Sequence, residues 1–162
     1  MKKLLTSAIV LAGAATLFAN EFKAGFARTD ITPPLGVYMP GYYQARHAKE
    51  VLDPLSINCV AFNDGKKTAL IMQFDTEALS DFVADGMRDA IVKATGVDRN
   101  AILLHASHTH DGGQLTQHVP LDASTEGKVE PLTDLYRKMA TTRAADAAVE
   151  AIRDLKPAKL SW

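Results

Sequence analysis

Apolar and polar positions follow different periods along the chain, and in the first half they predict strands. Residues 22–31 alternate up to the double proline at 33–34, which permits neither a continuing ladder nor the start of a helix. A strand followed by an extended loop is therefore expected. Two apolar runs, 57–62 and 68–74, flank the polar segment 63–67 and predict a β-hairpin.

Helical spacing begins after the second of these runs. Val83, Met87 and Ile91 recur at the helical period, Ser80 offers an N-cap, and Gly96 offers a left-handed stop. The segment 80–96 is therefore predicted to be an amphipathic helix.

The remaining pattern predicts a strand, a long helix and the start of another strand. The run 101–104 lacks polar alternation, which suits a strand buried on both faces of a sheet. A helix is expected from Pro131 to just before Pro157, and 158–162 resembles a strand that has just begun. The apolar stripe predicted for that helix comprises Leu132, Leu135, Tyr136, Met139, Ala145, Ala148, Val149 and Ile152.

The order of these elements predicts an α/β fold, a mixed sheet with flanking helices in which the first helix crosses over between two strands. The chain has 162 residues, the size of one ordinary domain or of part of a larger one. Because the last strand stops as it begins, we expect the chain to be an incomplete part of a larger domain.

The N-terminal 1–19 follow the pattern of a signal peptide. Lys2 and Lys3 form a basic start, an apolar run covers 4–18, and Ala19 offers a small residue for cleavage. The expectation is export to the periplasm or secretion, with 20–162 as the mature chain. The alternative is an uncleaved membrane anchor, although the run is short for a span of about 20 residues.

Composition and charge narrow the classes of partner. Eighteen Lys and Arg against nineteen Asp and Glu give a formal charge of -1, so no global positive field attracts nucleic acid, and we expect no nucleic-acid partner. Cys59 is the single cysteine, which excludes an intramolecular disulfide within the chain. Its apolar neighbours predict a small buried hydrophobe.

The histidines are the candidate functional residues, because four of the five lie within 105–118. His108 and His110 are spaced i and i+2, and on an extended backbone their side chains project to the same side. Two imidazoles are an incomplete set for catalytic zinc, which takes three protein ligands. A chance pair in a surface loop is the alternative. We expect His105 to be packed within the strand and His118 to be an ordinary surface residue.

Three further positions are candidates by their place in the pattern. Asp75 ends the run 68–74, where it is either a hydrogen-bond partner of the site or a plain strand-end cap. Gly41 and Tyr42 lie in a long loop and either bind substrate or pack over the edge of the core.

Three stretches of the sequence together resemble the N-terminal part of the catalytic domain of the neutral, non-lysosomal ceramidase family. They are Ala-Arg-Thr-Asp-Ile-Thr-Pro-Pro at 27–34, Met-Pro-Gly-Tyr at 39–42 leading to Asp-Pro-Leu at 53–55, and Ala-Ile-Leu-Leu-His-Ala-Ser-His-Thr-His at 101–110. The family's members are zinc-dependent amidases that split the N-acyl bond of ceramide into sphingosine and a fatty acid. The likeness covers 24–162.

The resemblance implies a role for each histidine of the motif. His108 matches a zinc ligand, and His110 matches a residue beside the metal that contacts substrate or the developing oxyanion. The other ligands, a histidine, a glutamate and a tyrosine, would come from a downstream part of the same polypeptide. The resemblance further implies a ceramide-like lipid amide as substrate, reached at a membrane surface, and a place in sphingolipid metabolism.

Departures from the family's pattern keep other functions open. The family commonly continues Ser-Gly-Pro after the second histidine, whereas this chain has Asp111, Gly112 and Gly113. Another amide or an ester is therefore an alternative substrate. A non-catalytic secreted lobe is the alternative from a different class, because two imidazoles alone do not complete a catalytic site.

Overall fold

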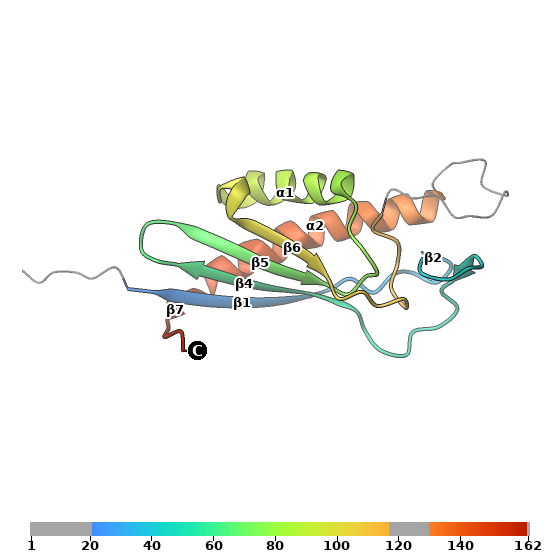
Figure 1. The fold of residues 1–162 in the computed structure, drawn as a ribbon, viewed down its shortest axis with the longest axis horizontal. Coiled ribbons are helices and arrows are strands. Elements are labelled where there is room, and N and C mark those ends of the chain that lie inside the picture. Colours follow the sequence, from blue (N-terminus) through green and yellow to red (C-terminus); the bar gives the residue numbers. More distant parts are fainter. Residues whose placement is uncertain (1–20, 117–129, 162) are drawn as a thin grey trace, which may run out of the picture.

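The computed structural model describes residues 21–116 and 130–161 (Figure 1). The predicted signal peptide and His118 lie outside these residues. In chain order the elements are β1 (Lys23–Asp30), β2 (Tyr38–Met39), β3 (Arg46–His47), β4 (Ser56–Asn63), β5 (Thr68–Phe74), α1 (Asp81–Thr95), the 3₁₀ turn η1 (Arg99–Ala101), β6 (Ile102–Ala106), α2 (Pro131–Arg153) and β7 (Lys156–Pro157). The predicted mixed α/β architecture is confirmed.

The main sheet has five strands in the order β6-β5-β4-β1-β7. The predicted hairpin is β4–β5, and β1 pairs antiparallel with β4. The predicted crossover is β5-α1-β6, with β5 and β6 parallel. Because both of these strands run in the same direction, the loops that follow them leave the sheet at the same edge.

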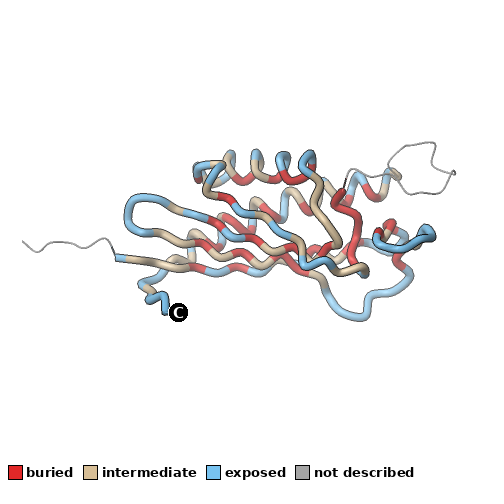
Figure 2. The backbone as a smooth tube through the Cα atoms, viewed as in Figure 1, coloured by how far each residue is buried: buried red, intermediate tan, exposed pale blue. Residues whose placement is uncertain are grey.

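Both helices cover the same face of the sheet (Figure 1). Along the strands, buried and exposed residues alternate (Figure 2). The covered face carries Ala27, Cys59, Ala61, Leu70, Met72 and Phe74, all buried. On the other face Phe26, Val60, Ile71 and Leu103 lie in register across four strands, and three of them are exposed by 39% or more.

The prediction that 101–104 is buried on both faces is therefore wrong. Leu103 is 54% exposed, because β6 is an edge strand of the described sheet and helices cover only one of its faces. His105, expected to be packed, is exposed for the same reason, since it shares that uncovered face with Leu103.

Helix α1 forms as predicted. Val83, Met87 and Ile91 are buried, and Gly96 ends the helix with a φ of 72°. Ser80 occupies the N-cap position, although its side chain makes no capping hydrogen bond.

The buried stripe of α2 agrees with the predicted one in part, because Tyr136 and Ala148 are buried and Leu132, Met139 and Ile152 pack against the core. Leu135 is 60% exposed, and the buried residues of α2 are Thr133, Tyr136, Ala140, Ala144, Ala147, Ala148 and Ala151. Small side chains let the helix lie close to the sheet. At Gly25 of β1 an added Cβ would come within 2.8 Å of the Leu155 nitrogen just beyond the helix. Close packing therefore decides which face of α2 is buried.

The chain after α2 also departs from the prediction. The helix ends at Arg153, before Pro157 is reached, and residues 156–157 form β7 beside the start of β1. The described residues from 158 onward are not in a strand. No helix among the described residues has both the length and the apolar character needed to cross a membrane.

Candidate metal centre

Two loops meet at the edge of the sheet where β5 and β6 end. The Ser107 nitrogen donates a hydrogen bond to the Phe74 carbonyl (2.9 Å), and the His108 nitrogen donates to the Thr76 carbonyl (3.0 Å). These two bonds extend the pairing of the parallel strands by one step. They place the residues after β5 directly beside the histidine motif after β6.

His108 has an uncommon backbone conformation. Its φ of 67° makes it the one non-glycine residue with positive φ in the described part of the chain. The extended backbone predicted for the motif is therefore wrong at His108, because the chain has left the strand and turns there. Such conformations cluster at functional sites, where the surrounding contacts hold them.

The His108 ring is held in one tautomer by a backbone carbonyl. Its Nδ1 lies 2.8 Å from the carbonyl oxygen of Glu77. A carbonyl oxygen only accepts, so Nδ1 carries the proton and donates. Nε2 is then left with the lone pair that a metal ion needs, and the same bond fixes the direction of the ring.

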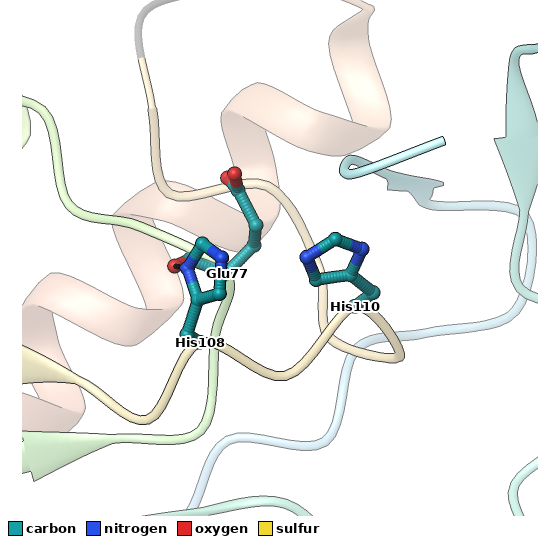
Figure 3. A group of neighbouring side chains, drawn as sticks. All are labelled: Glu77, His108 and His110. Atoms are coloured by element: carbon teal, nitrogen blue, oxygen red, sulfur yellow. Dashed lines mark hydrogen bonds between the residues drawn. The ribbon is translucent and has the colours of Figure 1, made fainter. Parts of the chain in front are cut away.

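Three side chains from the two loops converge at this point (Figure 3). The two imidazole centroids are 5.1 Å apart with planes at 76°. One potential ligand atom each of Glu77, His108 and His110 lies within 4.8 Å of the other two. Figure 3 shows Glu77 coming from the loop after β5 and both histidines from the loop after β6. Glu77 and His110 are half-buried, whereas His108 is exposed.

Glu77 is the residue that sequence reasoning missed. It sits in the short connection between β5 and α1, which has no motif of its own. The topology could have indicated it. Glu77 follows β5 and the histidine motif follows β6, and two parallel neighbouring strands end at the same edge of a sheet.

Gly41 and Tyr42 lie against His110. An added Cβ at Gly41, where φ is 95°, would come within 2.6 Å of the His110 Cγ. The Tyr42 ring meets the His110 ring edge-on, with centroids 5.8 Å apart. Whether these two residues bind substrate stays a prediction.

Arg46 ties this loop to the histidine motif. Its Nη2 donates to the His110 carbonyl and to the Asp111 carboxylate, both at 2.7 Å. Its guanidinium also lies over the Tyr42 ring, 3.7 Å from the centroid. The Arg46 guanidinium thus contacts the backbone at His110 and also the Tyr42 ring, which packs against the His110 ring.

Asp75 makes the contacts of a strand-end cap. Its carboxylate accepts hydrogen bonds from the Ser56 nitrogen and hydroxyl (both 3.0 Å) and from Gln73 (2.7 Å). Burial opposes its ionisation, but these bonds, with one from Ser107, outweigh burial and hold the pKa of Asp75 below its ordinary value. Among the described residues, none of its hydrogen bonds reaches Glu77 or the two histidines of the motif. The cap is therefore the alternative that its contacts support.

A cavity of about 520 Å³ opens beside the histidine loop. Thr109 and Asp111, on either side of His110, form part of its wall. Met39, Leu52 and Leu55 supply apolar wall, and the remaining lining includes charged side chains. The cavity therefore has both an apolar and a polar part, and it reaches the histidine loop at Thr109 and Asp111 without being lined by the three converging side chains.

Cys59 and His47 lie outside this site. Cys59 is buried, and burial raises the pKa of its thiol to about 12, which confirms the predicted small buried hydrophobe. The His47 ring lies 2.9 Å from the carboxylate of Glu130, the N-cap residue of α2.

Comparison with known proteins supports the fold. No protein-family model matches the chain, and no curated protein matches it. Among solved structures, neutral ceramidase from Pseudomonas aeruginosa is similar with a TM-score of 0.69 at 15% identity. A ceramidase complexed with C2 is similar with a TM-score of 0.68 at 16% identity. In each case the likeness covers 85% of this chain and 22% of the other. The expected resemblance is thus confirmed as a likeness of fold to part of neutral ceramidase.

Proposed function

We propose that this chain forms the N-terminal part of the catalytic region of a zinc-dependent amide hydrolase acting on a ceramide-like lipid amide. The observation that carries the proposal is the convergence of Glu77, His108 and His110 at the carboxyl ends of two parallel strands. The similarity of the fold to ceramidases supports it. The chain spans 22% of those proteins, so activity is proposed for the whole polypeptide rather than for this part alone.

The donor set fits zinc chemically. Imidazole nitrogen and carboxylate oxygen are both zinc ligands, and catalytic zinc sites keep one position open. His108 would bind through Nε2, because its Nδ1–H is occupied by the Glu77 carbonyl. When bound, zinc supplies Lewis acidity that polarises an amide carbonyl and lowers the pKa of water.

His110 would serve the reacting amide. Its ring lies beside His108, and Tyr42 and Arg46 hold the ring and its backbone. From that position an imidazole can donate a hydrogen bond to the carbonyl oxygen as negative charge develops there, or carry a proton to the leaving nitrogen. Gly41 lets the loop backbone pack directly against this ring, because an added Cβ would come within 2.6 Å of the His110 Cγ.

The cavity beside the histidine loop suits an amphipathic substrate. Its apolar wall at Leu52 and Leu55 can take hydrocarbon, while Arg46 and Lys49 can face a polar group. A lipid amide has both parts. Another amide or an ester with one apolar and one polar part would also fit. The enzyme assay described below distinguishes these substrates from a ceramide-like amide.

We also propose that the protein is exported and meets its substrate at a membrane surface. The pattern of residues 1–19 supports export to the periplasm or beyond. Mass measurement of the mature N-terminus tests this part of the proposal.

The test of function is hydrolysis of N-acylsphingosine by the longest polypeptide that the gene encodes, supplied with zinc. Matched simple esters and short-chain amides are assayed alongside it. Activity that falls at least about 100-fold in His108→Ala and is retained in His105→Ala is the expected result. His105 is the control because it is exposed and lies on the uncovered face of β6. Zinc-loaded wild type that hydrolyses none of these substrates would favour the non-catalytic lobe.

A further inference from the structure

We propose that Thr76 is the positioning residue of the loop 107–113, which follows β6 and carries His108 and His110 (Figure 3). Thr76 bonds to this loop at two points. Its carbonyl accepts a hydrogen bond from the His108 nitrogen (3.0 Å), and its hydroxyl donates one to the Gly113 carbonyl (3.0 Å). The proposal rests on the proposed function, because it concerns how that site holds its two histidines.

Thr76 is itself fixed by the core of the protein. It lies just beyond β5, none of its surface is exposed, and its nitrogen donates to the Phe74 carbonyl (2.9 Å). Its nitrogen, carbonyl and hydroxyl are therefore all paired. Rotation of its side chain would leave the buried Gly113 carbonyl without this donor, which is unfavourable away from water. The sheet thus holds Thr76, and Thr76 holds the loop.

Two buried glycines allow the end of the loop to lie close to Thr76. An added Cβ at Gly112 would come within 2.8 Å of the Asp75 carbonyl oxygen and 3.2 Å of the Thr76 Cα. At Gly113 it would come within 2.8 Å of the Tyr136 ring carbon Cζ. The ceramidase pattern commonly has proline at the position of Gly113, whereas here the Tyr136 ring occupies the space that its Cβ would need. This departure from the pattern is therefore matched by a buried tyrosine on α2.

Both histidines belong to the segment that Thr76 holds at its two ends. The first bond is made by His108 itself, and the second lies beyond His110, at Gly113. Without the Thr76 hydroxyl the first bond would remain and the second would be lost. We therefore expect His110 to be displaced more than His108, whose ring is also bonded to the Glu77 carbonyl.

Thr76 acts through the histidines rather than on the substrate. It does not line the cavity, and it offers no atom to the group of Glu77, His108 and His110. A displacement of about 1 Å at a group that serves the reacting amide can lower the rate about 100-fold. Loss of the Thr76 hydroxyl is therefore expected to affect catalysis more than substrate binding.

The first test compares the imidazole NMR signals of the metal-free chain, labelled at histidine, in wild type, Thr76→Val, Thr76→Ser and Thr133→Val. Valine keeps the shape of threonine but lacks its hydroxyl. We expect the His110 signals to move further than those of His108 in Thr76→Val, and to return to their wild-type positions in Thr76→Ser. Thr133→Val is the matched control, because Thr133 is 1% exposed and its hydroxyl has no hydrogen-bond partner among the described residues. It should leave both histidines in place.

The second test uses the longest polypeptide that the gene encodes, supplied with zinc and N-acylsphingosine. In Thr76→Val we expect kcat to fall at least about tenfold while KM changes by less than about threefold, because positioning is lost and substrate binding is not. In Thr76→Ser and in Thr133→Val, kcat should stay within about threefold of wild type.

The outcomes separate this proposal from the proposed function. His110 signals that stay in place in folded Thr76→Val, or an unchanged kcat of this variant in an active polypeptide, would overturn the positioning role. If the signals move but wild type hydrolyses no N-acyl substrate, the positioning role stands and the proposed function fails.

Circular dichroism establishes whether Thr76→Val is folded. If it is not, Thr76→Ala and Thr76→Ser are compared instead, since these two variants differ in the hydroxyl alone. Displaced His110 signals in Thr76→Ala but not in Thr76→Ser would support the positioning role, and identical histidine signals in the two variants would overturn it.

Discussion

At the scale of single residues, the orientation of His110 depends on a guanidinium contributed by the short strand β3. Arg46 bonds to the His110 carbonyl and to Asp111 while it lies over Tyr42. A lysine in its place keeps the charge and can donate hydrogen bonds, but its compact ammonium has no flat face to stack on the Tyr42 ring. The arrangement thus needs the planar guanidinium and not merely a positive charge.

We therefore expect Arg46→Lys to shift the NMR signals of the His110 imidazole and to leave those of His105 in place. The free energy of unfolding should fall by about 1 kcal/mol. Asp111→Asn is the control, because the Asp111 side chain is 74% exposed and exposed pairs contribute less than about 1 kcal/mol. A His110 signal that does not move in Arg46→Lys would contradict this positioning role.

At the scale of elements, the carboxylate of Asp75 ties the end of β5 to the start of β4. It receives three hydrogen bonds from Ser56 and Gln73. An asparagine would turn an NH₂ group toward one of these donors. At neutral pH we expect Asp75→Asn to lower the free energy of unfolding by about 1.5–3 kcal/mol. Asp53→Asn, at an exposed position, should change it by less than about 0.5 kcal/mol.

The pH dependence of this effect follows from the pKa of Asp75, which lies below its ordinary value in the folded chain. The carboxylate contributes its full stabilisation above the unfolded pKa of about 4 and loses it as pH falls through the folded pKa. Denaturant unfolding of wild type and Asp75→Asn should therefore differ by a constant amount at pH 6–8 and converge below pH of about 4. If the two unfolding free energies still differ at pH of about 2, the ionised carboxylate of Asp75 is not the source of the stabilisation.

The elements could be predicted from the sequence wherever one local signal decided them. Alternating strands, a polar hairpin loop and a left-handed stop at Gly96 all act within a few residues. The predicted stripe of α2 was wrong at Leu135 and missed Ala140, Ala144, Ala147 and Ala151, because the helix packs largely through alanines. Which face of α2 is buried depends on how closely the helix approaches β1. The local sequence pattern of the helix does not contain that information.

At the scale of the whole molecule, only the part of the candidate site that is local in sequence could be predicted. His108 and His110 are close in sequence and could be found as a motif. Glu77 is 31 residues away from His108 and joins the site only through the parallel pairing of β5 with β6. The turn at His108 likewise arises from contacts with Thr76 and Glu77, so the predicted extended backbone could not be corrected from the sequence.

The two-layer architecture makes a prediction that two neighbouring residues can test. Met72 is fully buried under the helices, whereas Ile71 points to the uncovered face and is 39% exposed. Met72→Ala should lower the free energy of unfolding by about 2–5 kcal/mol through lost burial and a cavity. Ile71→Ala should cost about 1 kcal/mol, because much of its side chain stays in water. Urea unfolding of both variants measures the difference. Equal losses would mean that both faces of the sheet are covered in solution, which contradicts the one-sided arrangement.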